Sequence, residues 1–194
     1  MGTVRAMLAL LLLATLYVAS LVLFPVEEVT VEGLRHLKRE EVLARTGILP
    51  GEPWLWLTAR RLNPLLQDPW VASARMEKPG PGRVRLLLRE RTPFLPLPGG
   101  DALAEDGTLL PGGAPLARGP RVEGKGPLPV QDLLALARAY PGAQRLRYTP
   151  GGFWVELPQA RIFAPNVRLL LEYAQSARPE GQVYVYSWGV SVRP

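Results

Sequence analysis

The sequence contains no cysteine and only one histidine, His36, among its 194 residues. Disulfides, thiolate nucleophiles and cysteine zinc sites are therefore excluded, and a lone histidine completes neither a catalytic triad nor a metal site. The four Asp residues are scattered, and no carboxylate pair has the spacing of a glycosidase dyad. The glycines lie with prolines in turns and show no phosphate-binding spacing. We expect no enzyme, no catalytic residue, no metal and no cofactor.

Positive charge exceeds negative charge, since 23 Lys and Arg stand against 17 Asp and Glu and give a net charge of +6. Such an excess can indicate a nucleic-acid partner. Here the arginines are scattered singly, without a basic block and without interleaved aromatic residues. The pattern therefore favours a solvated surface, and no nucleic-acid partner is expected.

The most apolar part of the chain is Ala6–Phe24, which is 19 residues long and carries no charge. A helix of this length spans roughly 28 Å, close to the thickness of the hydrocarbon layer of a bilayer. Arg5 precedes the run, and Glu27 and Glu28 follow it. This pattern predicts a single-pass transmembrane anchor at residues 6–24, a cytoplasmic tail at residues 1–5 and an extracytoplasmic body.

A cleavable secretory signal is the alternative for the same run. Val18-Ala19-Ser20 is an acceptable but poor cleavage site, and cleavage there would leave an apolar new terminus. The apolar core of a signal is usually about 7 to 15 residues long, shorter than this run. The anchor is the favoured interpretation.

The residues after the anchor alternate between strand and helix patterns. A strand is expected from Val26 to Gly33, because Val29 and Val31 alternate with polar residues. The following segments predict two helices and then two strands joined by a Pro-Gly-Pro-Gly turn: Lys38–Thr46, Thr58–Gln67, Trp70–Lys78 and Arg83–Glu90. The order β-α-α-β-β predicts two helices on one face of a three-stranded sheet, and an α+β fold class.

The second half of the chain predicts a further mixed α/β sheet domain. Asp106-Gly107 is a hairpin signal between two short apolar runs, and residues 111–129 read as an irregular excursion. Helices are expected at Val130–Tyr140 and from a cap at Asn166 to about Ala177. Strands are expected at Ala143–Tyr148, Phe153–Leu157 and Arg161–Phe163, followed by a terminal hairpin over Gln182–Arg193.

Several motifs in the first half resemble the POTRA domain of the FtsQ/DivIB family of bacterial cell-division proteins. They are Val29–Gly33 (VTVEG), Gly47–Gly51 (GILPG), Asp68–Ala74 (DPWVASA), Pro81 with Val84–Leu86, and Glu90–Pro93 (ERTP). The short tail and single anchor agree with that family. The resemblance implies a POTRA domain at residues 25–97 and a β domain at residues 98–194.

By resemblance, the chain is a non-enzymatic scaffold that binds FtsB/DivIC and FtsL. It would thereby help to control septal cell-wall synthesis by FtsW and a transpeptidase. The family's partner-binding strand edge corresponds here to the last segment, where we expect Tyr184, Val185, Tyr186 and Trp188 to bind the partner. Tyr186 and Gly189 match the family pattern, whereas Val183 and Val185 replace an aspartate and an arginine. We expect strand addition by a partner at this last, aromatic-bearing strand, with the tyrosines covering a helix or loop of this chain as the alternative.

The resemblance also implies a location in the inner (plasma) membrane at the division septum. A POTRA-containing periplasmic chaperone or a secretion and assembly module is the alternative function. A cell-wall hydrolase is less favoured, because the sequence lacks catalytic groups. Partner identity, stoichiometry, oligomeric state and the role of residues 111–129 do not follow from the sequence.

Overall fold

The computed structural model describes residues 2–175 and 179–193, and the chain divides into two compact units between Arg91 and Thr92. We call the residues up to Arg91 unit 1 and those from Thr92 unit 2. The sequence placed the domain boundary after residue 97. In the structure β4 (Pro93–Pro96) pairs with β5 (Ala102–Ala104), and this pairing draws residues 93–96 into unit 2.

Unit 1 begins with α1 (Gly2–Leu23), a single continuous helix over the apolar run. Its large apolar side chains are exposed; Leu8, Leu12 and Leu16 have exposed fractions of 61%, 61% and 51%. In the described part of the chain, no helix combines the length and the apolar character that a membrane crossing requires. The transmembrane span expected over residues 6–24 is therefore not confirmed, although the run is helical as expected.

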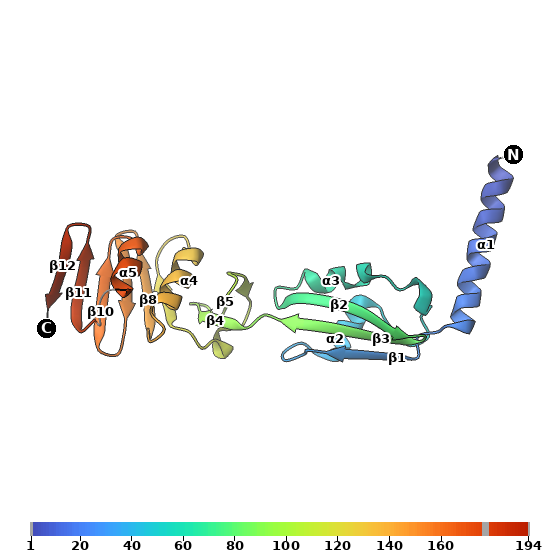
Figure 1. Cartoon of the computed structure of the whole chain (residues 1–194), viewed down its shortest axis with the longest axis horizontal. Coiled ribbons are helices and arrows are strands. Elements are labelled where there is room, and N and C mark those ends of the chain that lie inside the picture. Colours follow the sequence, from blue (N-terminus) through green and yellow to red (C-terminus); the bar gives the residue numbers. More distant parts are fainter. Residues whose placement is uncertain (1, 176–178, 194) are drawn as a thin grey trace. The chain divides into compact units, whose positions relative to one another are not determined.

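The sheet of unit 1 has the strand order β1-β3-β2 (Figure 1), with β1 at Glu28–Glu32, β2 at Val71–Gly80 and β3 at Arg83–Glu90. β2 and β3 form an antiparallel pair, whereas β1 runs parallel to β3. The parallel pairing is possible because helical segments separate β1 from the hairpin. Val29 lies opposite Val84 and Val31 opposite Leu86, so one face of the sheet is apolar.

Helices cover that apolar face. They are α2 (Arg39–Thr46), α3 (Asn63–Leu66) and the 3₁₀ turns η1 (Trp54–Trp56) and η2 (Ala59–Leu62). The helix expected over Thr58–Gln67 is divided into η2 and α3, because Pro64 has no N–H to donate within a continuous helix. Val42, Ile48 and Leu65 are almost completely buried against the sheet. The order β-α-α-β-β is confirmed.

A buried carboxylate holds the loop between β1 and α2. Glu90, only 9% exposed, accepts backbone hydrogen bonds from the N–H groups of Arg35 (2.8 Å), His36 (2.9 Å) and Leu37 (3.1 Å). Gly33 opens this loop with φ 87°, and a Cβ there would lie 1.8 Å from the Leu88 carbonyl oxygen. Only glycine allows this close approach. The sequence indicated only a strand end at Glu90, and the structure adds its role in the loop.

Unit 2 contains a six-stranded sheet and a small three-stranded sheet (Figure 1). The small sheet has the order β4-β5-β6, with β6 at Leu109–Leu110, and Asp106-Gly107 forms the expected β5–β6 turn. The large sheet has the order β12-β11-β10-β9-β8-β7. Its strands are β7 (Arg121–Gly124), β8 (Arg145–Thr149), β9 (Gly152–Glu156), β10 (Ala160–Ala164), β11 (Gly181–Tyr186) and β12 (Gly189–Arg193).

Residues 111–129 are more regular than the sequence suggested. They contain the 3₁₀ turn η3 (Ala114–Leu116) and β7, which pairs in parallel with β8. The expectation of a wholly irregular excursion is therefore wrong. β7 was missed because it has a single apolar residue, Val122, and its pairing partner lies beyond a helix.

Two helices connect the parallel pairs and cover one face of the large sheet. They are α4 (Val130–Ala139), between β7 and β8, and α5 (Val167–Ala174), between β10 and β11. The expected end of α5 near Ala177 lies outside the described residues. The expected cap is confirmed, since Asn166 Oδ1 accepts a hydrogen bond of 3.1 Å from the N–H of Leu169.

The core of unit 2 lies between these helices and the sheet. Leu133, Leu136 and Leu170 of the helices are fully buried against Leu146, Val155 and Ile162 of the strands. Tyr140 links the helices, because its hydroxyl donates a hydrogen bond of 2.6 Å to the Leu170 carbonyl. Burial, and secondarily the nearby Tyr173, raises the pKa of Tyr140 well above its ordinary value. Its hydroxyl therefore remains a donor at physiological pH.

We predict that Glu90→Gln loosens the loop at residues 35–37. The neutral side chain turns an amide NH₂ toward backbone donors, and losing hydrogen bonds to a carboxylate costs about 1 to 3 kcal/mol. Amide hydrogen exchange of the full chain, measured by mass spectrometry, should be faster in the peptide containing Arg35–Leu37. Glu28→Gln, an exposed carboxylate on β1, is the matched control. Equal exchange in the two variants would contradict this role of Glu90.

Candidate partner-binding surface

The C-terminal hairpin forms one edge of the six-stranded sheet. β11 pairs in parallel with β10 on one side and antiparallel with β12 on the other. β12 pairs with β11 alone in the described part of the chain. The hairpin is therefore present as expected, but its edge is β12, whereas the tyrosines lie on the interior strand β11. The main chain of β11 is already used on both sides.

The four residues expected to bind a partner lie in different environments. Val185 is 5% exposed and belongs to the core, as does Val183. Tyr184 and Tyr186 are half-buried on the opposite face, which α4 and α5 do not cover and which we call the open face. Trp188 is 80% exposed, in the turn between β11 and β12. Of the four, Trp188 is the side chain most accessible to another molecule.

Aromatic rings from three strands and the hairpin turn gather on the open face. The Trp154 ring lies 4.8 Å from Phe163 and 5.8 Å from Tyr184, measured between centroids. Phe163 lies 6.5 Å from Tyr186, which stacks on Trp188 at 5.2 Å with an interplanar angle of 2°. We call these five residues the aromatic row. The tyrosines thus pack partly on the chain's own aromatic rings, on the face of the sheet that α4 and α5 leave uncovered.

The sequence indicated the tyrosines and Trp188 but not Trp154 and Phe163. Both missed residues occupy outward positions in the alternating pattern of β9 and β10. The signal was present in each strand. Whether these residues come together with the tyrosines depends on the order of the strands in the sheet, which local sequence patterns do not specify.

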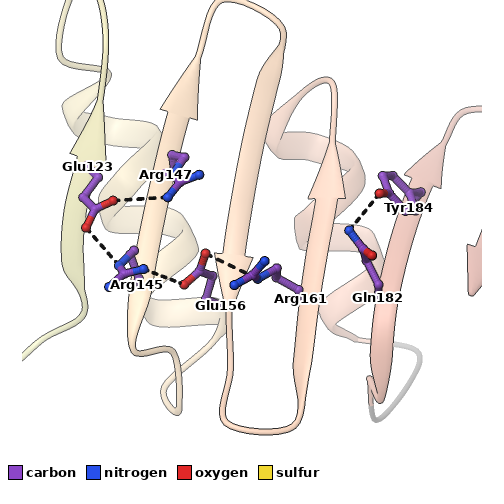
Figure 2. Close-up of polar contacts among 7 residues, drawn as sticks. All are labelled: Glu123, Arg145, Arg147, Glu156, Arg161, Gln182 and Tyr184. Atoms are coloured by element: carbon purple, nitrogen blue, oxygen red, sulfur yellow. Dashed lines mark hydrogen bonds and ion pairs between the residues drawn. The ribbon is translucent and has the colours of Figure 1, made fainter. Parts of the chain in front are cut away.

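Charged side chains continue the open face beyond the aromatic row, as Figure 2 shows. Glu156 lies between Arg145 (3.1 Å) and Arg161 (3.5 Å), and Glu123 lies between Arg145 (3.0 Å) and Arg147 (3.4 Å). Opposite charges alternate across the strands, so this part of the face is largely neutralised. Nearer β12, Gln182 Nε2 donates a hydrogen bond of 2.8 Å to the Tyr184 hydroxyl (Figure 2).

β12 exposes apolar side chains on the side of the sheet that carries the core. Val190 and Val192 are 51% and 58% exposed, although they lie opposite the buried Val185 and Val183. They extend the apolar face of the sheet beyond the part that is covered. The sequence showed their alternation, but it gave no sign that they remain uncovered.

The chemistry of this surface suits the binding of another protein. It offers an open strand edge, two exposed valines and an exposed tryptophan, which supply main-chain hydrogen bonds and apolar contact. In the portion of the chain that is described, no three His, Cys, Asp or Glu residues lie together as a metal site would require.

Comparison with known proteins gives two matches. The family profile described as POTRA domain, FtsQ-type, matches residues 24–91, which include the whole β-α-α-β-β arrangement of unit 1. The chain is also 37% identical over 71 residues to the cell division protein FtsQ of Syntrophotalea carbinolica. That alignment covers 36% of this chain and 25% of the relative, so the chain spans about a quarter of the curated protein that it matches. Both matches agree with the resemblance found in the sequence.

We predict that Glu156→Gln destabilises unit 2. The Glu156 side chain is 15% exposed and faces two arginines, so its loss leaves the partly buried Arg145 and the exposed Arg161 without their shared partner. The expected cost is about 1 to 2 kcal/mol, measured by urea unfolding followed through tryptophan fluorescence. Glu172→Gln is the control, because its pair with Arg168 is exposed and should leave the midpoint unchanged. Equal midpoints for both variants would show that Glu156 does not stabilise the sheet.

Proposed function

We propose that this chain is a member of the FtsQ/DivIB family of cell-division proteins and acts as a non-enzymatic, membrane-attached scaffold of the division machinery. The observation that carries this proposal is the FtsQ-type POTRA match over residues 24–91. In this proposal unit 2 binds other division proteins, and through them helps to control septal cell-wall synthesis. The partners implied by the family are FtsB/DivIC-like and FtsL-like proteins. FtsW and the septal transpeptidase are indirect partners, which this chain would influence through those proteins.

The binding mode that we propose is strand addition at β12. In an antiparallel hairpin, pairs that hydrogen-bond to each other alternate with pairs that do not. The N–H and C=O groups of the second kind of pair point away from the hairpin partner. Tyr186 and Gly189 close a two-residue turn, so Val190 and Val192 fall at the positions whose N–H and C=O groups point outward. A partner strand at this edge would extend the six-stranded sheet.

The side chains beside this edge would give the contact its specificity. An added strand with alternate apolar residues would cover Val190 and Val192, and a helix or loop following it could extend the cover. On the open face, Trp188 and Tyr186 form a stacked pair at the end of the edge. Large aromatic side chains of this kind are frequent anchors of protein interfaces. Tyr184 and Val185 act indirectly in this proposal, by positioning the aromatic row and the core behind the edge.

Membrane attachment is the second part of the proposal. The exposed apolar side chains of α1 would contact lipid, and the single-pass anchor inferred from the sequence is the arrangement that we propose. The two units would then lie on the extracytoplasmic side, at the division septum. Attachment would hold unit 2 close to partners in the same membrane.

A POTRA-containing chaperone or secretion module is the alternative function. Depletion of this protein in its native cell separates the two. A division scaffold predicts filaments with missing or incomplete septa, seen by microscopy, before envelope proteins are lost. Normal septation, with defects in protein export or envelope assembly, would overturn the division proposal and favour the alternative.

We predict that Val192→Pro abolishes co-purification with an FtsB-like partner. Proline removes the N–H that a partner strand would use, while the hairpin keeps its bonds to β11. The matched control is Val192→Ala, which retains the N–H and should weaken binding without abolishing it. Circular dichroism of both variants checks that unit 2 is folded. Undiminished binding by a folded proline variant would rule out strand addition at β12.

A further inference from the structure

The loop before η1 is bound directly to the segment that leaves α1. The N–H of Trp54 donates to the Phe24 carbonyl (3.1 Å), and the N–H of Val26 donates to the Glu52 carbonyl (2.8 Å). Gly51 donates in turn to the Val26 carbonyl at 2.8 Å. These bonds hold residues 49–57 against the end of α1.

Trp56 makes a second connection to α1 through its side chain. Its indole Nε1–H donates a hydrogen bond of 2.9 Å to Ser20 Oγ, and its ring lies 6.2 Å from that of Tyr17. Ser20 is only 4% exposed, although it belongs to a helix whose other described side chains are mostly exposed. The polar edge of Trp56 is thus satisfied within the protein, while much of its ring remains accessible.

Trp54 and Trp56 have different roles, although they are two residues apart. Trp54 packs at the margin of the unit 1 core, and its Nε1–H donates 2.9 Å to the Arg83 carbonyl. Trp56 is 47% exposed and its neighbour Leu55 is 52% exposed. Trp54 therefore anchors η1 in the fold, and η1 presents Leu55 and Trp56 outward.

Five large side chains in this region are exposed together. Besides Leu55 and Trp56, Leu49 is 49% exposed, Tyr17 44% and Phe24 40%. Grouped apolar exposure of this kind is unusual on a soluble surface and marks a contact site. The group is continuous with the apolar exterior of α1, since Tyr17 and Phe24 belong to the end of that helix and the residue after it. We call these five residues the collar.

We propose that the collar is a lipid-contact site that seats unit 1 on the headgroup region of a bilayer. Tryptophan and tyrosine favour this region, because their rings are apolar and their polar edges form hydrogen bonds. Cations accompany the collar. Lys78 Nζ donates 2.7 Å to the Trp54 carbonyl and lies 4.9 Å from the centre of its ring. Just after η1, η2 carries the exposed Arg60, and also Arg61, which is paired with Glu52 at 3.6 Å. These charges favour anionic headgroups.

This inference rests on the membrane attachment in the proposed function but adds a separate claim. Attachment alone requires only α1 in contact with lipid. The collar adds a second contact from the folded domain, which limits how freely unit 1 turns about the end of α1.

Site-directed spin labelling tests the collar, because a chain without cysteine accepts single labelled positions cleanly. The full chain is reconstituted in vesicles of phosphatidylcholine and phosphatidylglycerol. Nitroxides are placed singly at Leu55→Cys and at the control Leu66→Cys, which replaces a similarly exposed leucine on α3. We expect the ratio of collision with oxygen to collision with a water-soluble nickel complex to be several-fold higher at position 55. Equal ratios at the two positions would overturn the inference.

A third label, Leu12→Cys in α1, separates this inference from the attachment that it rests on. Lipid accessibility at position 12 with an aqueous position 55 would leave attachment standing and remove the collar. Water-exposed labels at both position 12 and position 55 would rule out both membrane attachment through α1 and lipid contact by the collar. Dipolar broadening at position 55 would show contact between two copies of the chain and would also overturn lipid contact. Brominated lipid tests the same inference without a spin label. We expect it to quench tryptophan fluorescence of the unsubstituted chain and of Trp188→Phe, and the quenching to be lost in Trp56→Phe.

Discussion

Among the described residues, helices cover one face of each main sheet and leave the other face open, and most of the structure follows from that constraint. Alternation along a strand sends Val84 and Leu86 into the core and Arg85 to the uncovered side. The uncovered side must then be compatible with water. In unit 1, Arg85 lies between Glu32 (3.3 Å) and Glu77 (3.8 Å), much as Arg145 of unit 2 lies between two glutamates. Several arginines on the uncovered faces are thus held in local ion pairs with glutamates.

Besides the exterior of α1, two groups of exposed apolar side chains stand out among the described residues. One is the collar beside α1 in unit 1, and the other is β12 with Trp188 in unit 2. Both lie where a layer of the structure stops, at the end of a helix or at the edge of a sheet. Burying either surface against a bilayer or a partner would be favourable, because it would remove apolar side chains from water that remain exposed after folding. The chain thus separates a surface suited to lipid from a surface suited to protein.

The sequence predicted the elements whose signals are local. Alternation over residues 83–90, the Asp106-Gly107 turn and the Asn166 cap each depend on a few neighbouring residues, and each is present. β7 was missed because Val122 is flanked by polar residues and glycines, and its parallel partner lies beyond α4. The contact of Glu90 with residues 35–37 joins positions more than fifty residues apart, which no local pattern reveals.

The candidate binding surface was only partly predictable for the same reason. The sequence indicated the tyrosines and Trp188. It also included Val185 among the partner-binding residues, whereas the structure buries Val185 in the core beside Val183. Which strand forms the edge depends on the parallel pairing of β10 with β11, and this follows from the crossover through α5. The expectation of an exposed, tyrosine-bearing edge was therefore wrong about the strand, although it identified the correct hairpin.

The parallel pairing of β1 with β3 has a consequence for the order of folding. The hairpin of β2 and β3 closes over a short turn, whereas Thr30 of β1 meets the Val84 carbonyl across 54 positions. Closing a long loop costs more conformational entropy and is slower, so we expect β1 to join the sheet after the hairpin has formed. β1 also follows α1 after only a few residues. The slowest step in completing the domain is then the step that draws α1 into place.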